Sequence, residues 1–133
     1  MIQKLTNVTL FVSDQDKALE FYTSKLGFTK LADHQYGNGP RYLEVGFPDQ
    51  DTSLVLWKGT PLPPRDAANG GTSGAWVLST NDVRGEYERL RAQGVQFEQT
   101  ETQQAPGALW MSLADPDGNR FVLREARPEA RSR

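Results

Sequence analysis

Apolar and polar residues alternate over residues 4–12, and this period of two predicts a β-strand. Over residues 14–26 the apolar positions instead recur every three or four residues, as on one face of an amphipathic helix. Ser13, with Asp16 three residues later, is typical of a helix N-terminus, and Gly27 is the residue type that commonly ends a helix. The chain therefore predicts a strand followed by a helix.

Three further strand-like runs follow this helix, at residues 28–35, 41–47 and 52–58. They are separated by a Gly-rich bend at residues 37–40 and by a turn at residues 48–51 that contains Pro and Asp. Short connections of this kind join neighbouring antiparallel strands. The first half of the chain thus predicts the order β-α-β-β-β.

The same order of patterns restarts after residues 59–72, a stretch rich in Pro and Gly that we interpret as a linker. Residues 73–80 are strand-like, Asn81 is a typical helix cap, and apolar residues then follow helical spacing up to Gly94. Three more strands are expected at residues 95–100, 109–114 and 119–124. The repeated order indicates an internal duplication.

The sequence therefore predicts an α+β fold with two β-α-β-β-β modules. The first module spans residues 1–58 and the second spans residues 73–126, with a linker at 59–72 and a tail at 127–133. A chain of 133 residues has the size of one compact domain overall. Each module would pack one helix against a four-stranded sheet, and the two sheets could curl around a trough.

The composition argues against several classes of function. The formal net charge is -2 and no basic stripe is present, so we expect no nucleic-acid partner. No apolar run is long enough to cross a membrane and residues 1–12 lack a signal-peptide design, so we expect no membrane partner and a cytoplasmic location. With 0 Cys and 1 His, thiolate chemistry and a two-histidine metal site within one chain are excluded. We interpret His34 as a surface or edge-strand residue.

Three stretches carry a resemblance to a known family. They are NVTLFVSDQDKALEFYTSKLGF at residues 7–28, WVLSTNDVRGEYERLRAQGVQF at 76–97 and DPDGNRFVL at 115–123. In this order they resemble the vicinal oxygen chelate superfamily, which includes glyoxalases, extradiol dioxygenases, and fosfomycin- and bleomycin-resistance proteins. The resemblance implies paired modules that form a cupped mixed sheet with the helices on its outer face, usually in a homodimer.

The resemblance also implies a divalent metal ion held by His, Glu or Gln side chains from four strands. Counting from Asp14 and Asp82 places two of the ligand positions at Asn7 and Ala75, and counting from Gly118 places the last at Val122. The fourth-strand position falls on Leu56, within one step of register. Alanine, valine and leucine have no donor atom, so we expect no metal ion and no cofactor.

Alternation groups the side chains of the first and last strands by side, and the family resemblance implies which of these sides face the trough. Thr9 and Phe11 share a side with Asn7, and Arg120 and Arg124 share a side with Val122. An arginine on a concave face needs an acidic partner or an anionic ligand. The two interpretations that stay open are internal pairing, with Glu44, Glu125 or Asp115, and binding of a carboxylate or phosphate.

Aromatic residues and one carboxylate complete the candidate site. Trp57 and Trp110 would offer a flat platform if they face the trough, whereas Trp76 is expected in the core. Glu44 is a candidate base, and we interpret the Asp-Pro-Asp-Gly-Asn stretch at 115–119 as a structural turn and not a calcium loop. The candidate ligand-binding residues are Asn7, Thr9, Phe11, Glu44, Leu56, Trp57, Ala75, Trp110, Arg120, Val122 and Arg124.

Three functions remain open on this basis. The first is binding of a small planar or anionic molecule without metal and without catalytic residues, as in bleomycin-resistance proteins that sequester a drug. The second is a metal-dependent enzyme of the glyoxalase or dioxygenase type, against which the replaced ligands stand. The third is a non-catalytic partner-binding module whose trough is filled by side chains.

Overall fold

The computed structural model describes residues 1–60 and 75–126. The chain divides into two compact units, Met1–Leu62 and Pro63–Arg133. Most of the expected linker at 59–72, the start of the strand expected at 73–80, and the expected tail at 127–133 lie outside the described residues. Both units contain a helix packed on a mixed sheet, so the α+β prediction is confirmed.

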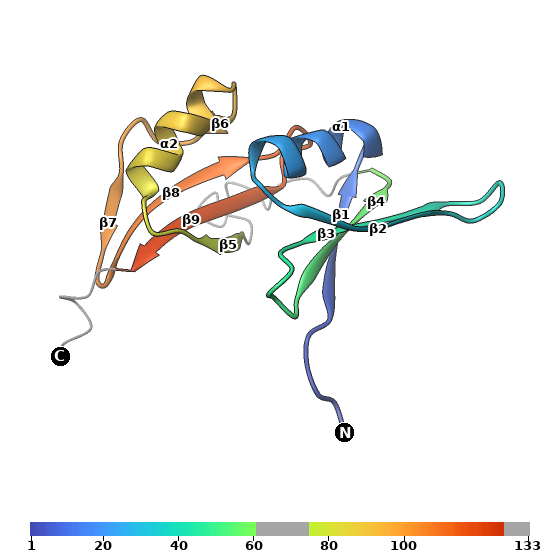
Figure 1. Ribbon diagram of the computed structural model, residues 1–133. Coiled ribbons are helices and arrows are strands. Elements are labelled where there is room, and N and C mark those ends of the chain that lie inside the picture. The colour runs from blue at the N-terminus through green and yellow to red at the C-terminus, as the bar shows by residue number, and fades with distance from the viewer. Residues whose placement is uncertain (61–74, 127–133) are drawn as a thin grey trace, which may run out of the picture. The chain divides into compact units, whose positions relative to one another are not determined.

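The first unit follows the predicted order of elements. Its strands lie in the order β1-β4-β3-β2, with β1 parallel to β4 and the other neighbours antiparallel (Figure 1). The elements are β1 (Asn7–Val12), α1 (Gln15–Glu20), the π-helical turn η1 (Phe21–Lys25), β2 (Thr29–Gln35), β3 (Arg41–Gly46) and β4 (Ser53–Lys58).

The second unit repeats this topology with one additional strand. Its sheet has the order β5-β9-β8-β6, and β7 also pairs with β8 (Figure 1). Its first strand, β5, is parallel to its last strand, β9, as β1 is parallel to β4. The elements are β5 (Trp76–Ser79), α2 (Val83–Ala92), β6 (Gln96–Phe97), β7 (Gln103–Ala105), β8 (Ala108–Ala114) and β9 (Arg120–Ala126).

The core of each unit lies between its helix and one face of its sheet. In the first unit, Leu10, Leu43 and Leu56 are buried under α1 and η1. In the second, Met111 packs with Val83 and Tyr87 of α2. Among the described residues of each unit, no helix covers the opposite face of the sheet, and we call these two surfaces the helix-free faces.

The single strand expected at residues 95–100 is wrong, since only Gln96–Phe97 forms a strand there. Directly after this strand, a side-chain hydrogen bond replaces the backbone hydrogen bond that would continue the pairing with β8. The backbone N–H of Ser112 in β8 donates to Oε1 of Gln99 at 2.8 Å, in place of a backbone partner. Side chains that bind the backbone in this way compete with a strand ladder.

The helix starts are each one residue later than expected. Asp14, and not Ser13, caps α1, because its carboxylate accepts from the backbone N–H of Lys17 at 3.0 Å. Asp82, and not Asn81, caps α2 by accepting from the backbone N–H of Gly85 at 2.9 Å. An Asp at this position binds the third helical N–H, which would otherwise have no partner within the helix.

Trp76 is not the core residue that its alternation suggested. It lies beside Phe121 on the face that packs against α2, yet 44% of its surface is exposed. The reason is its place on β5, which is at the edge of the sheet and, among the described strands, pairs with β9 alone.

Candidate functional site

The helix-free face of the first sheet carries the β1 side chains that alternation assigned to it. Asn7 and Phe11 are half-buried and Thr9 is exposed, while Leu10 and Val12 between and beyond them are buried. The alternate side chains of β1 therefore point to opposite faces, as a strand requires.

The fourth-strand position, expected at Leu56 within one step of register, lies one residue earlier, at Val55. Leu56 lies beside Leu10 in the parallel pair of β1 and β4, and it is fully buried on the helix side. Val55 lies beside Thr9 on the helix-free face, in the way that Val122 lies beside Val77 in the second sheet. The run Leu54-Val55-Leu56 is apolar throughout, so it lacks the alternation that would have set its register.

Glu44 also belongs to the helix-free face of the first sheet, directly opposite Val55. Its two carboxylate oxygens accept hydrogen bonds from the hydroxyls of Tyr42, at 2.9 Å, and Ser53, at 2.5 Å. Several effects raise the pKa of Tyr42, of which burial is the largest and the hydrogen bond to Glu44 the second. The edge-strand residue His34 lies opposite Tyr42 and is exposed, as predicted.

On the helix-free face of the second sheet, Arg120 has an acidic partner. Its Nε donates to Oε1 of Glu98 at 2.9 Å and to Oε2 at 3.1 Å. The hydroxyl of Ser112 donates to Oε1 of the same carboxylate at 2.5 Å. Internal pairing therefore accounts for Arg120, although its partner is none of the three acids considered from the sequence.

Arg124 is in a different situation on the same face. It is exposed and lies directly opposite Trp110, which is half-buried, in the antiparallel pair of β8 and β9. Within residues 1–60 and 75–126, no side chain forms a hydrogen bond or ion pair with its guanidinium. The face thus offers an indole and an available guanidinium side by side, with Val122 next to them on the same strand.

In the turn at residues 115–119, the carboxylate of Asp115 accepts hydrogen bonds from the turn itself. Asp115 is buried, and its Oδ1 accepts from the backbone N–H of Asp117 at 2.9 Å and of Asn119 at 2.7 Å. Gly118 has a positive φ of 87°, which a glycine adopts without strain. These bonds hold the turn that leads into β9, in keeping with a structural role.

The residues at the four positions where the family resemblance implies metal ligands do not fit a metal ion. With the register of β4 corrected, they are Asn7, Val55, Ala75 and Val122. Three of these side chains are hydrocarbons and the fourth is a neutral amide, whereas Zn²⁺ is held by imidazole, thiolate or carboxylate ligands. Among the described residues, no group of three or more His, Cys, Asp or Glu side chains could hold a metal ion.

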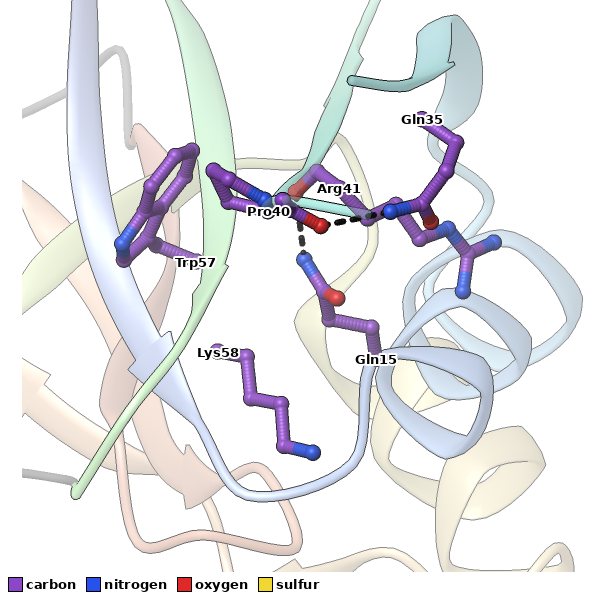
Figure 2. Close-up of a pocket in the computed structure, with 7 residues that line it drawn as sticks. Gln15, Gln35, Pro40, Arg41, Trp57 and Lys58 are labelled. Carbon is purple, nitrogen blue, oxygen red and sulfur yellow. Dashed lines mark hydrogen bonds between the residues drawn. The ribbon is translucent and has the colours of Figure 1, made fainter. Parts of the chain in front are cut away.

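A hollow of about 380 Å³ lies at one end of the first sheet, where α1 begins. It is lined by Gln15, Pro40, Arg41, Trp57 and Lys58 among others (Figure 2). Of these, the sequence had singled out Trp57 alone. Gln15 could have been noticed, because the equivalent first residue of α2 is the apolar Val83.

Comparison with known proteins agrees with this fold. A family model described as the Glyoxalase/Bleomycin resistance protein/Dioxygenase superfamily matches residues 4–123. The chain therefore belongs to this superfamily. The resemblance noted from the sequence is confirmed, and the two mixed sheets of four and five strands match the glyoxalase fold.

Several relatives are similar over nearly the whole chain. The uncharacterized protein YetH of Bacillus subtilis (strain 168) is 33% identical over 125 residues, which cover 94% of this chain and all (100%) of YetH. The crystal structure of UcmS2 has a TM-score of 0.77 and 37% identity, and the match covers 95% of this chain and 100% of that one. The structure of TnmS3, an antibiotic binding protein from Streptomyces sp. CB03234, has a TM-score of 0.75 and 32% identity, over 95% and 98% of the two chains.

Proposed function

We propose that this protein binds a small planar or anionic organic molecule on the helix-free face of its second sheet, without a metal ion and without catalysis. The observation that carries the proposal is the pair formed by Trp110 and Arg124. An indole provides a flat apolar surface, and a guanidinium provides two parallel donors for a carboxylate. A planar anion would use both.

Two further observations support the proposal. The hydrocarbon side chain of Val122 stands where the family resemblance implies a metal-binding side chain. This face therefore offers a ligand apolar and charged side-chain contacts in place of a metal ion. In addition, the chain is similar to an antibiotic binding protein, TnmS3, whose function by its name is binding. On the first sheet, Thr9, Phe11 and Glu44 form a second helix-free face that could contact a ligand in the same way.

The test compares a planar anion with its neutral counterpart. We expect naphthoate to bind more tightly than naphthamide in isothermal titration calorimetry with the full chain. Arg124→Gln should weaken naphthoate binding by about tenfold to a hundredfold, because a charge-assisted hydrogen bond contributes about 1.5–3 kcal/mol, and should leave naphthamide binding unchanged. Arg91→Gln, which removes a guanidinium from α2, is the matched control and should change neither affinity.

Metal independence has its own test. Binding measured before and after dialysis against a chelator should be the same, and metal analysis of the purified protein should find no stoichiometric divalent ion. A divalent ion present at one equivalent per chain and required for binding would overturn the proposal. Equal loss of naphthoate and naphthamide in Arg124→Gln would overturn the assignment of Arg124 to an anionic group.

A further inference from the structure

The hollow at the end of the first sheet lies where two strands separate. β3 and β4 pair at Glu44 with Val55 and at Val45 with Leu54, and among the described residues the ladder continues no further. The equivalent strands of the second unit, β8 and β9, pair over their full length, from Ala108 with Ala126 to Ala114 with Arg120. The first sheet is therefore open at a place where the second sheet is closed.

Gln15 reaches into this opening from the start of α1 (Figure 2). Its Nε2 donates to the carbonyl oxygens of Arg41 in β3 and Leu56 in β4, each at 2.9 Å, and only 8% of the residue is exposed. Both amide hydrogens are thus used. Within residues 1–60 and 75–126, no group donates to its Oε1, so this oxygen can accept a hydrogen bond from a ligand.

The cations of the hollow differ in their partners. Arg41 is bound by Asp33, through two hydrogen bonds of 2.9 Å, and by Asp16 at 2.7 Å. Lys58 is exposed and forms no ion pair with a side chain in the described part of the chain. Its ammonium is therefore the group of the hollow that can take an external anion.

The internal duplication shows what Lys58 replaces. In the second unit the equivalent residue is Glu125, whose carboxylate accepts from the backbone N–H of Val83, the first residue of α2, at 2.9 Å. In the first unit the acid is replaced by a base, and the apolar Val83 is replaced by Gln15. A carboxylate supplied by the chain in one unit is thus missing in the other, where a cation and a polar amide face a hollow.

We propose that this hollow binds a small aromatic carboxylate that carries a hydrogen-bond donor. Its carboxylate pairs with Lys58, its donor binds Oε1 of Gln15, and its ring lies against Trp57 and Pro40. Trp57 and Lys58 are consecutive residues on opposite sides of β4, and both line the hollow because the strands have separated there (Figure 2). A volume of about 380 Å³ suits a molecule of this size. The site lies within the first unit and uses neither Trp110 nor Arg124.

Calorimetric titration of the full chain with para-hydroxybenzoate and its neutral amide tests the proposal. We expect millimolar or tighter binding of the acid and weaker binding of the amide. Lys58→Gln should weaken the acid about tenfold and leave the amide unchanged, whereas Lys58→Arg, which keeps the charge, should retain most of the affinity. Lys25→Gln on η1 is the control and should behave as wild type. Circular dichroism of each variant shows that it is folded.

The outcomes separate this site from the function proposed above. Arg124→Gln should leave para-hydroxybenzoate binding unchanged, so loss of binding in Arg124→Gln and not in Lys58→Gln would overturn the hollow as the site. Absence of binding at millimolar concentration, or equal affinity of wild type and Lys58→Gln for the acid, would also overturn it. Neither result bears on naphthoate binding at the second sheet.

Discussion

Arg120 and Arg124 lie four residues apart on one face of one strand, with Val122 between them on that face, and their surroundings make them chemically different. The carboxylate of Glu98, which follows the short strand β6, binds Arg120 with both oxygens. Arg124 has Trp110 as its cross-strand neighbour instead. Arg120 therefore serves to hold residues 98–99 on the sheet, and Arg124 is the guanidinium that remains for a ligand.

The Glu98 carboxylate should make the stability of the protein depend on pH. Burial acts to raise the pKa of Glu98, but the hydrogen bonds from Ser112 and Arg120 outweigh it and hold the pKa below its ordinary value. A carboxylate with a lowered pKa stabilises the folded state above the pKa of the unfolded chain, and this contribution is lost as the pH falls through the folded pKa.

We therefore expect Glu98→Gln to lower the free energy of unfolding at about pH 7 by up to about 1 kcal/mol, since the side chain is half-exposed. The difference from wild type should shrink as the pH falls through the lowered pKa of folded Glu98, below which the side chain is protonated in both the folded and the unfolded state. Urea unfolding of both proteins at several pH values measures this difference in the free energy of unfolding. Glu88→Gln is a suitable control, and a difference that stays constant with pH would contradict the prediction.

Among single residues of β1 and β9, the face of a side chain could be predicted and its partner could not. Alternation grouped Thr9 with Phe11 and Arg120 with Arg124, because a strand has a fixed period of two, and the family resemblance indicated which face each group occupies. The pairing of Arg120 with Glu98 joins residues 22 positions apart through an irregular segment. No local pattern encodes such a distance.

At the scale of elements, the helix caps show how a one-residue difference arises. Ser13-Asp14 and Asn81-Asp82 each contain two residues able to cap a helix, and the sequence does not distinguish them. In both units the second residue has the extended or otherwise non-helical backbone of a cap, and its carboxylate accepts from the N–H three residues later.

Asp82→Ala should therefore destabilise the protein by about 1 kcal/mol, because the backbone N–H of Gly85 loses its partner. Asn81→Ala is the matched control, and we expect it to change the free energy of unfolding by less than about 0.5 kcal/mol. Chemical denaturation of the two variants and wild type gives both values. A larger effect from Asn81→Ala would show that the cap lies at Asn81 in solution.

The strands were predicted best where apolar and polar residues alternate. Alternation identified β1, and turn residues separated β2 from β3. The apolar run of β4 left its register open by one step, and the pairing with β1 decided that Val55 faces away from the helix. β7 was missed because it has three residues, which is too short for a periodic pattern.

At the scale of the whole molecule, duplication explains both the likeness and the differences of the two units. Each unit places its first strand parallel to its last and packs a helix on one face. Two of their differences lie in the proposed binding hollow, where the first unit has Gln15 and Lys58 and the second has Val83 and Glu125. No described helix is long and apolar enough to span a membrane.

We also propose that the protein forms a homodimer, as the family resemblance implies. Sedimentation equilibrium should then give a mass of twice the 14.9 kDa of one chain over a range of concentrations. As a control, sedimentation equilibrium is repeated in the presence of naphthoate, and ligand-free and ligand-bound protein should have the same mass. A mass of one chain at all concentrations would contradict the expectation.

The sequence by itself determined the order of elements apart from β7, the duplication, the family, and the identity of the residues at three of the four positions where metal ligands were expected. These features depend on local periodicity and on residue types, which are present in the chain before it folds. The tertiary structure alone decided the register of β4, the partner of Arg120, and the opening between β3 and β4 that Gln15 bridges. These depend on contacts between residues distant in the chain, and packing and hydrogen bonding select them only when the sheets form.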